Sequence, residues 1–138
     1  MRRLLLIILL FASSCNFEGE INLGSGYFLL GDEGNTAICK KITNYDAYSS
    51  VILGEILDYD YDSESIIILR KASEAAKVYF NTQEDLWNKQ KGADSIQYWI
   101  IIKDKDIIKG PLTGKEFLSE KRKLNLSADL KLESNRFY

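Results

Sequence analysis

The chain contains no histidine. Histidine is the usual base of Ser-His-Asp and Cys-His catalytic groups and the commonest ligand of catalytic zinc. Its absence therefore excludes these classes of active site. The chain also has no excess of basic over acidic residues, because its 138 residues carry a net charge of −2. We predict no cofactor and no nucleic-acid partner, since a protein that binds nucleic acid needs a basic surface.

Cysteine is scarce, with only Cys15 and Cys39 in the chain. Cys39 follows Ala37 and Ile38, and we expect it to be a small buried core residue. A reactive thiol needs a base or a cation beside it, and Lys40 would point to the opposite face of a strand. If Cys15 stayed unmodified, the two cysteines would be candidates for a disulfide.

Long hydrophobic runs are absent as well. The longest, Leu4–Ala12, would span about 14 Å as a helix, less than half of a hydrocarbon core of about 30 Å. Arg2 and Arg3 precede this run, and two serines and Cys15 follow it. A charged start, an apolar middle and a small-residue exit form an export signal, which we predict over residues 1–14.

This segment resembles the signal of bacterial lipoproteins, in which the cysteine after the small residues is lipidated. The resemblance implies lipidation of Cys15 and attachment to a membrane through that lipid. Asn16 is not the aspartate that retains such proteins in the inner membrane, so the resemblance implies the outer membrane or the cell surface. Residues 12–14 also fit an ordinary signal peptidase, which leaves simple secretion as an alternative.

The remainder divides into two parts. Residues 15–25 are predicted to be the lipidated cysteine and a glycine-containing tether, and residues 26–138 a single domain. For that domain we predict an α+β fold, with a small, mostly antiparallel β-sheet of about five to seven strands and one or two packed helices.

The predicted strands are short apolar runs separated by turn residues. Residues 31–35 have the composition of a hairpin loop, and residues 104–105 that of a tight turn. Residues 66–69 should form a central strand buried on both faces. Residues 44–50 are expected to be a connection. The expected strands are 27–30, 36–42, 51–57, 66–69, 98–103 and 106–109, with a final short one at 128–132.

Two segments have helical periodicity. Residues 72–91 repeat apolar side chains at helical spacing, as one helix or two. Thr113 lies three residues before Glu116, which is the spacing of a capping box, and predicts a helix that ends near Leu124. We expect three apolar side chains of this helix, Phe117, Leu118 and Leu124, to dock on the sheet. Lys121-Arg122-Lys123 should be a solvated face at the helix end.

The last third of the chain, YWIIIKDKDIIKGPLTGKEFLSEKRKLNL, is similar to a family of small bacterial lipoproteins of unknown function. The acidic, tyrosine-containing stretch before the isoleucine strand fits the same pattern. The resemblance implies an α+β domain behind a lipoprotein signal. It carries over no activity and no site residue.

Asp58, Asp60 and Asp62 match positions 1, 3 and 5 of a calcium-binding loop. The match then fails, because Ser63 stands where the loop needs glycine and Leu69 where it needs glutamate. These aspartates are candidate ligands for a divalent cation. The alternating pattern favours instead a strand end with its acids toward solvent and with Tyr59 and Tyr61 inward.

The aromatic residues offer a second candidate site, a stacking platform for sugars. In a domain of this size such side chains more often fill the core. A glycosidase would need two carboxyl groups at a set separation, which spacing in the sequence does not show. We predict a non-catalytic module of accessory or inhibitor type that binds an envelope protein, with a module for a glycan or a divalent cation as the alternative. The aromatic residues concerned are Tyr59, Tyr61, Trp87, Tyr98 and Trp99.

Overall fold

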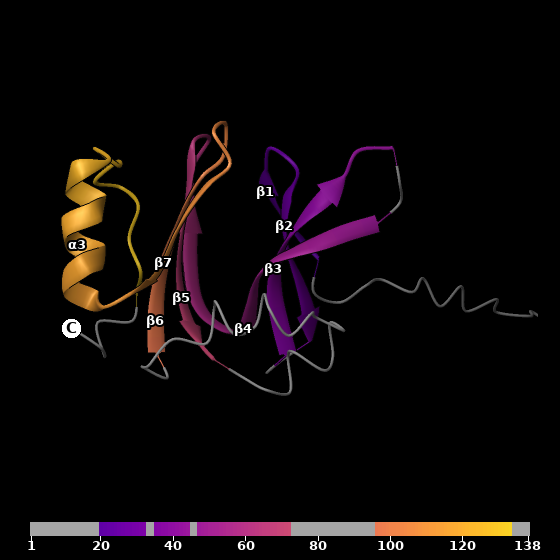
Figure 1. The fold of residues 1–138 in the computed structure, drawn as a ribbon, viewed down its shortest axis with the longest axis horizontal. Helices are drawn as coiled ribbons and strands as arrows, with labels where there is room; N and C mark the ends of the chain where they lie inside the picture. The colour runs from indigo at the N-terminus through magenta and orange to yellow at the C-terminus, as the bar shows by residue number, and fades with distance from the viewer. Residues whose placement is uncertain (1–19, 33–34, 45–46, 73–95, 134–138) are drawn as a thin grey trace, which may run out of the picture.

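The computed structural model describes residues 20–32, 35–44, 47–72 and 96–133 (Figure 1). They form seven antiparallel strands, each paired with the next in sequence, and one helix. The elements are β1 (Ile21–Gly24), β2 (Tyr27–Asp32), β3 (Asn35–Ile42), β4 (Ala47–Tyr61), β5 (Ser65–Lys71), β6 (Ile96–Ile102), β7 (Ile107–Leu112) and α3 (Gly114–Lys123). The mostly antiparallel sheet with a helix is confirmed, and the described part is mostly β. None of the described helices is long and apolar enough to cross a membrane.

The sheet bends at β4, which spans 15 residues and serves both halves of the sheet. Its first half pairs with β3 and its second half with β5. The register of the β3–β4 ladder shifts around Val51 and that of the β4–β5 ladder around Leu57, and such bulges bend a strand and increase its twist. Gly54 lies between them at φ +134°, where a Cβ would come within 2.6 Å of the Lys71 carbonyl oxygen. The bend brings β1–β3 opposite β5–β7 (Figure 1).

Two hydrophobic clusters follow from this bend. The inner cluster lies between the two halves of the sheet and consists of Leu23, Tyr27, Leu29, Ile38, Ile52, Ile66, Ile68, Trp99 and Ile101. The outer cluster joins the other face of β5 and β6 to α3 and the segment after it, and consists of Ile67, Leu69, Tyr98, Ile100, Phe117, Leu130 and Leu132. Successive residues of β5 enter different clusters, so this strand is buried on both faces, as its apolar run predicts.

The helix begins as the sequence predicts. Thr113 accepts a hydrogen bond from the Glu116 amide, and the Glu116 carboxylate accepts one from the Thr113 amide, which completes the capping box. Phe117 and Leu124 pack in the outer cluster, but the expectation that Leu118 docks with them is wrong, because this side chain is 42% exposed. The basic helix end is only partly a solvated face. The Lys121 ammonium donates to the Leu130 carbonyl, and this bond ties the C-terminal segment to α3.

Three predictions of local structure need correction. Residues 21–24, assigned to the tether, form β1, because Leu23 is buried in the inner cluster. Residues 47–50, expected as a connection, belong to β4. Residues 128–132 are not a strand, although Leu130 and Leu132 are buried. The helices expected within residues 72–91 fall almost wholly outside the described residues.

Candidate functional site

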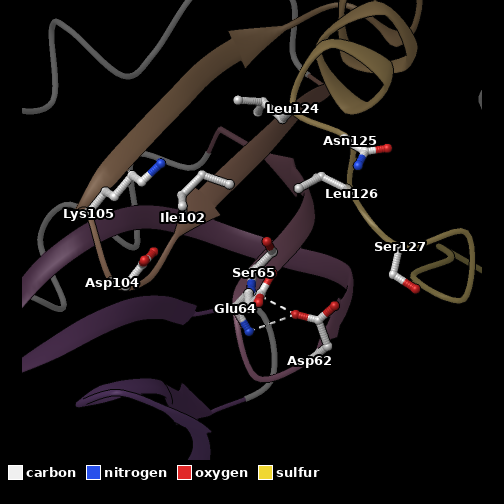
Figure 2. Close-up of a pocket in the computed structure, with 10 residues that line it drawn as sticks. All are labelled: Asp62, Glu64, Ser65, Ile102, Asp104, Lys105, Leu124, Asn125, Leu126 and Ser127. Carbon is white, nitrogen blue, oxygen red and sulfur yellow. Dashed lines mark hydrogen bonds between the residues drawn. The ribbon is translucent and has the colours of Figure 1, made fainter.

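A cleft of about 370 Å³ lies at one end of the outer cluster (Figure 2). Three segments that are distant in sequence surround it. These are the β4–β5 turn, the β6–β7 turn and the chain that leaves α3. Its volume is at the lower end of the range for small-ligand pockets, about 300–1,000 Å³.

The C-terminus of α3 forms the first wall. Asn125 adopts a left-handed conformation, with φ +51°, and its amide donates to the Arg122 carbonyl at 3.0 Å. The Leu126 amide donates to the Lys121 carbonyl at 3.1 Å. This pair of bonds is a Schellman motif, which reverses the chain after a helix. It places Leu124 and Leu126, both half-buried, over the outer cluster at the edge of the cleft.

The β4–β5 turn forms the second wall. One Asp62 carboxylate oxygen accepts hydrogen bonds from the Glu64 and Ser65 amides, at 2.9 and 2.8 Å. These bonds fix the carboxylate, and its second oxygen turns toward Ser127 (Figure 2). The turn itself is an Asx-type turn, in which aspartate replaces a backbone acceptor.

Ser65 is the polar residue of the cleft floor. It is 3% exposed and stands opposite Ile102 in the β5–β6 ladder. Its side chain points into the cleft toward Ile102 and Leu126 (Figure 2). Among the residues that the structure describes, none forms a hydrogen bond with its hydroxyl group. The hydroxyl therefore faces the open cleft, where it can bond to water or to a ligand.

The rim of the cleft is acidic. Asp62, Glu64 and Asp104 contribute carboxylates, and Lys105 contributes the single ammonium. Within the described ranges these three acids form no salt bridge. The Lys105 side chain runs along β7 and points away from Asp62 and Glu64 (Figure 2). The basic residues in the last turn of α3 do not line the cleft.

Lys103 lies on the other face of the sheet and is 3% exposed. Its ammonium donates to the Leu23 and Asp62 carbonyls and lies 5.3 Å from the centre of the Tyr61 ring. Burial lowers the pKa of Lys103, and the Asp62 charge opposes that shift. These contacts hold the end of β6 to β1 and to the β4–β5 turn.

A second polar contact joins the two halves of the sheet. The Tyr27 hydroxyl donates to Asp106 at 2.7 Å, and the Lys40 ammonium donates to the same carboxylate oxygen. The Lys40 hydrogen bond, followed by that from Tyr27, lowers the pKa of Asp106. Burial of the Tyr27 hydroxyl, followed by its bond to Asp106, raises the pKa of Tyr27.

This contact predicts a pH dependence. Because the pKa of Asp106 is lower in the folded protein, its stabilising effect is complete above the ordinary pKa of about 4 and is lost as the pH falls through the folded value. We expect the Asp106→Asn variant to be less stable than the wild type at pH 6, and the difference to shrink below pH 4. Urea unfolding between pH 2 and pH 6 measures it. A difference that stayed constant over this range would contradict the assignment.

The aspartates of the predicted cation site do not form a shared site. Asp58 and Asp60 each accept a hydrogen bond from the next amide in β4, at 2.8 and 2.9 Å, and Asp60 accepts another from Lys131. Asp62 is fixed in the turn described above. Among the described residues there is no group of three acidic, histidine or cysteine side chains that could hold a metal ion.

The other sequence candidates are mostly core residues. Cys39 is 2% exposed, and burial raises the pKa of its thiol to about 11, as expected for an inert core cysteine. Tyr98 and Trp99 are both 3% exposed. Tyr59 and Tyr61 stack at 6.4 Å on the inner face, and only Tyr61 is largely exposed. Cys15 and Trp87 lie outside the described residues.

The edge of the sheet at β7 is a second candidate surface. Among the described strands β7 pairs only with β6. Ile107 is 37% exposed and Ile108 is 43% exposed. Consecutive residues of a strand point to opposite faces, so both faces of this edge carry an exposed isoleucine.

Sequence reasoning missed Ser65, Lys103 and Asp104 as residues of possible sites. Alternation offered a signal for two of them. Ser65 precedes Ile67 and Leu69 on the outer face, and Lys103 follows Trp99 and Ile101 on the inner face. Both are polar residues at positions where the pattern of the strand predicts burial.

Comparison with known proteins gives one match. A family model described as protein of unknown function (DUF3997) matches residues 24–136. No curated protein and no solved structure matches the chain. The match covers β2–β7 and α3, but only the last residue of β1.

Proposed function

We propose a function for this chain, which belongs to DUF3997, a family of proteins of unknown function. It is a lipid-anchored protein of the bacterial cell envelope, and its domain binds another protein without catalysis. The anchor is the lipid on Cys15, and the location is the outer membrane or the cell surface. The family match begins at residue 24, which leaves the predicted signal and Cys15 outside the family domain. This division supports the proposal that the N-terminal segment serves for export and anchoring, separately from the domain.

The observation that carries the interaction is the edge of β7. An unpaired strand edge presents backbone N–H and C=O groups that an extended segment of another protein can pair with. Ile107 and Ile108 would add side-chain contacts on both faces of the new strand. We infer that the partner adds a strand to β7.

The absence of histidine and the burial of Cys39 support a non-catalytic role. The alternative, a module for a glycan or a divalent cation, has less support. Tyr98 and Trp99 fill the core, and the aspartates of β4 are bonded to backbone amides.

Photocrosslinking in the native cell envelope tests the β7 surface. We expect a benzophenone amino acid at position 108 to give one adduct of defined mass. The same group at position 57 should not give that adduct, because Leu57 has a similar exposure of 38% but lies in β4. An Ile107→Lys change in the same chain should abolish the adduct, since it places a charge in the apolar contact.

Equal adducts at both positions, or none at position 108 in a folded protein, would contradict the proposal. A circular dichroism spectrum unchanged from the wild type controls for folding of each variant.

A further inference from the structure

The geometry of the cleft points to a site for an alkylammonium group, meaning a primary amine on a short chain of methylenes. This inference concerns a surface other than the β7 edge and goes beyond the proposed function. Three features of the cleft support it: its apolar side chains, the Ser65 hydroxyl and its acidic rim.

Part of the cleft lining is apolar and suits methylene groups. Ile102, Leu124 and Leu126 are half-buried, pack against the outer cluster and line the cleft. Burial of each methylene group from water against such a surface contributes about 0.8 kcal/mol. The volume of about 370 Å³ fits a short chain and is small for a large ligand.

The hydroxyl of Ser65 supplies a polar contact inside the cleft. The residue is 97% buried, its side chain points into the cleft, and its hydroxyl group has no hydrogen-bond partner among the described residues (Figure 2). The hydroxyl is thus open to a ligand in the cleft, and a hydrogen bond to a charged group contributes about 1.5–3 kcal/mol.

The acidic rim selects a cation. Glu64 and Asp104 face the cleft from two different turns, and within the described residues neither forms a salt bridge. The Asp62 carboxylate adds negative charge to the rim, and the same charge raises the pKa of Lys103 against the effect of burial. An ammonium has three N–H donors, and the carboxylates of Glu64 and Asp104 and the Ser65 hydroxyl are acceptors of the kind that it binds.

The rim also explains why a simple metal ion fits less well. The described residues contain no cluster of three metal-ligating side chains. A divalent cation would need several oxygen ligands at close range. An organic cation needs fewer oxygen ligands, and its methylene chain would pack against Ile102, Leu124 and Leu126.

Titration of the folded protein with 1,5-diaminopentane, followed by amide NMR, tests the site. We expect a dissociation constant on the order of 1–10 mM, with the largest shifts at Ser65, Asp104 and Leu126. The neutral 1-pentanol and the anionic pentanoate should bind at least about tenfold more weakly, because they lack the charge-assisted hydrogen bonds.

Three variants locate the contacts. Asp104→Asn and Ser65→Ala should each weaken diamine binding about three- to tenfold. Glu55→Gln is the matched control, because it removes an acid from β4 outside the cleft and should leave binding unchanged. An equal loss in Glu55→Gln, equal binding of pentanoate, or no shift in the cleft at 50 mM diamine would overturn the proposal.

Two sources can supply this chemistry, and a second probe separates them. Tighter binding of a blocked Gly-Lys-Gly peptide than of the diamine would support a lysine side chain of a protein. Tighter binding of the diamine would support a free amine. Failure of both probes overturns the site. The Ile108→Lys variant should leave these titrations unchanged, so the outcome is independent of the proposed β7 interface.

Discussion

Replacing Cys15 with serine is expected to move the protein from the membrane fraction to the soluble fraction. Each buried methylene of an acyl chain contributes about 0.8 kcal/mol of membrane affinity, so two or three chains anchor a protein almost irreversibly. The full chain carries a net charge of −2, and losing Arg2 and Arg3 with the signal would make the mature protein more acidic. The domain therefore has no basic excess to replace the lipid.

The measurement is fractionation of cells that express the wild type, Cys15→Ser or Ser14→Ala. Ser14→Ala is the matched control, because it keeps a small residue before the cysteine and should remain in the membrane fraction. Intact mass adds a direct readout. A mature wild-type protein with the mass of the unmodified chain starting at Cys15 would contradict lipidation and support simple secretion.

Replacing Gly110 with alanine is expected to give the largest loss of stability among single substitutions in the sheet. A Cβ at this position would lie 2.3 Å from the Trp99 ring, and the φ of +152° is one that residues with side chains rarely adopt. Trp99 is 3% exposed and also lies against the Arg70 guanidinium, 5.3 Å from the ring centre. The ring therefore has no open space to move into. We expect a loss of about 3–5 kcal/mol from backbone strain and overpacking together.

Gly26→Ala separates these two causes. Gly26 has a φ of +81°, but nothing lies within 4 Å of a Cβ placed there. This variant should lose only about 1 kcal/mol, from backbone strain alone. Urea unfolding of the two variants measures the difference. Equal losses would show that Gly110 does not pack against the Trp99 ring as described.

The local features that the sequence predicts correctly each depend on a few neighbouring residues. The capping box of Thr113 and Glu116 is one example, and the turn predicted at residues 104–105 is another, although the structure extends it over residues 103–106. The buried strand around Ile67 is another, because four consecutive apolar residues leave no polar face for solvent. In each case the backbone conformation and its hydrogen bonds are decided within one short segment.

The features that sequence reasoning missed depend on distant contacts. β1 has few apolar residues, and pairing with β2 together with the burial of Leu23 makes it a strand. Residues 128–132 have the composition of a strand, but Leu130 and Leu132 are buried against the outer face of the sheet rather than paired at its edge. The candidate cleft was not predictable either, since its walls come from two turns and the segment after α3, which meet only when β4–β7 pair and α3 packs on them.

The sequence by itself determined that histidine-dependent active sites are excluded, and it determined the turns and helix caps that divide the chain. It did so because the absence of histidine, the length of an apolar run and the spacing of Thr113 and Glu116 need no tertiary contact. Only the tertiary structure decided that β4 serves both halves of the sheet, with Gly54 at the point where it bends. That bend places Asp106 beside Tyr27 and buries Lys103 between β1 and the β4–β5 turn, because it brings together residues up to 80 positions apart.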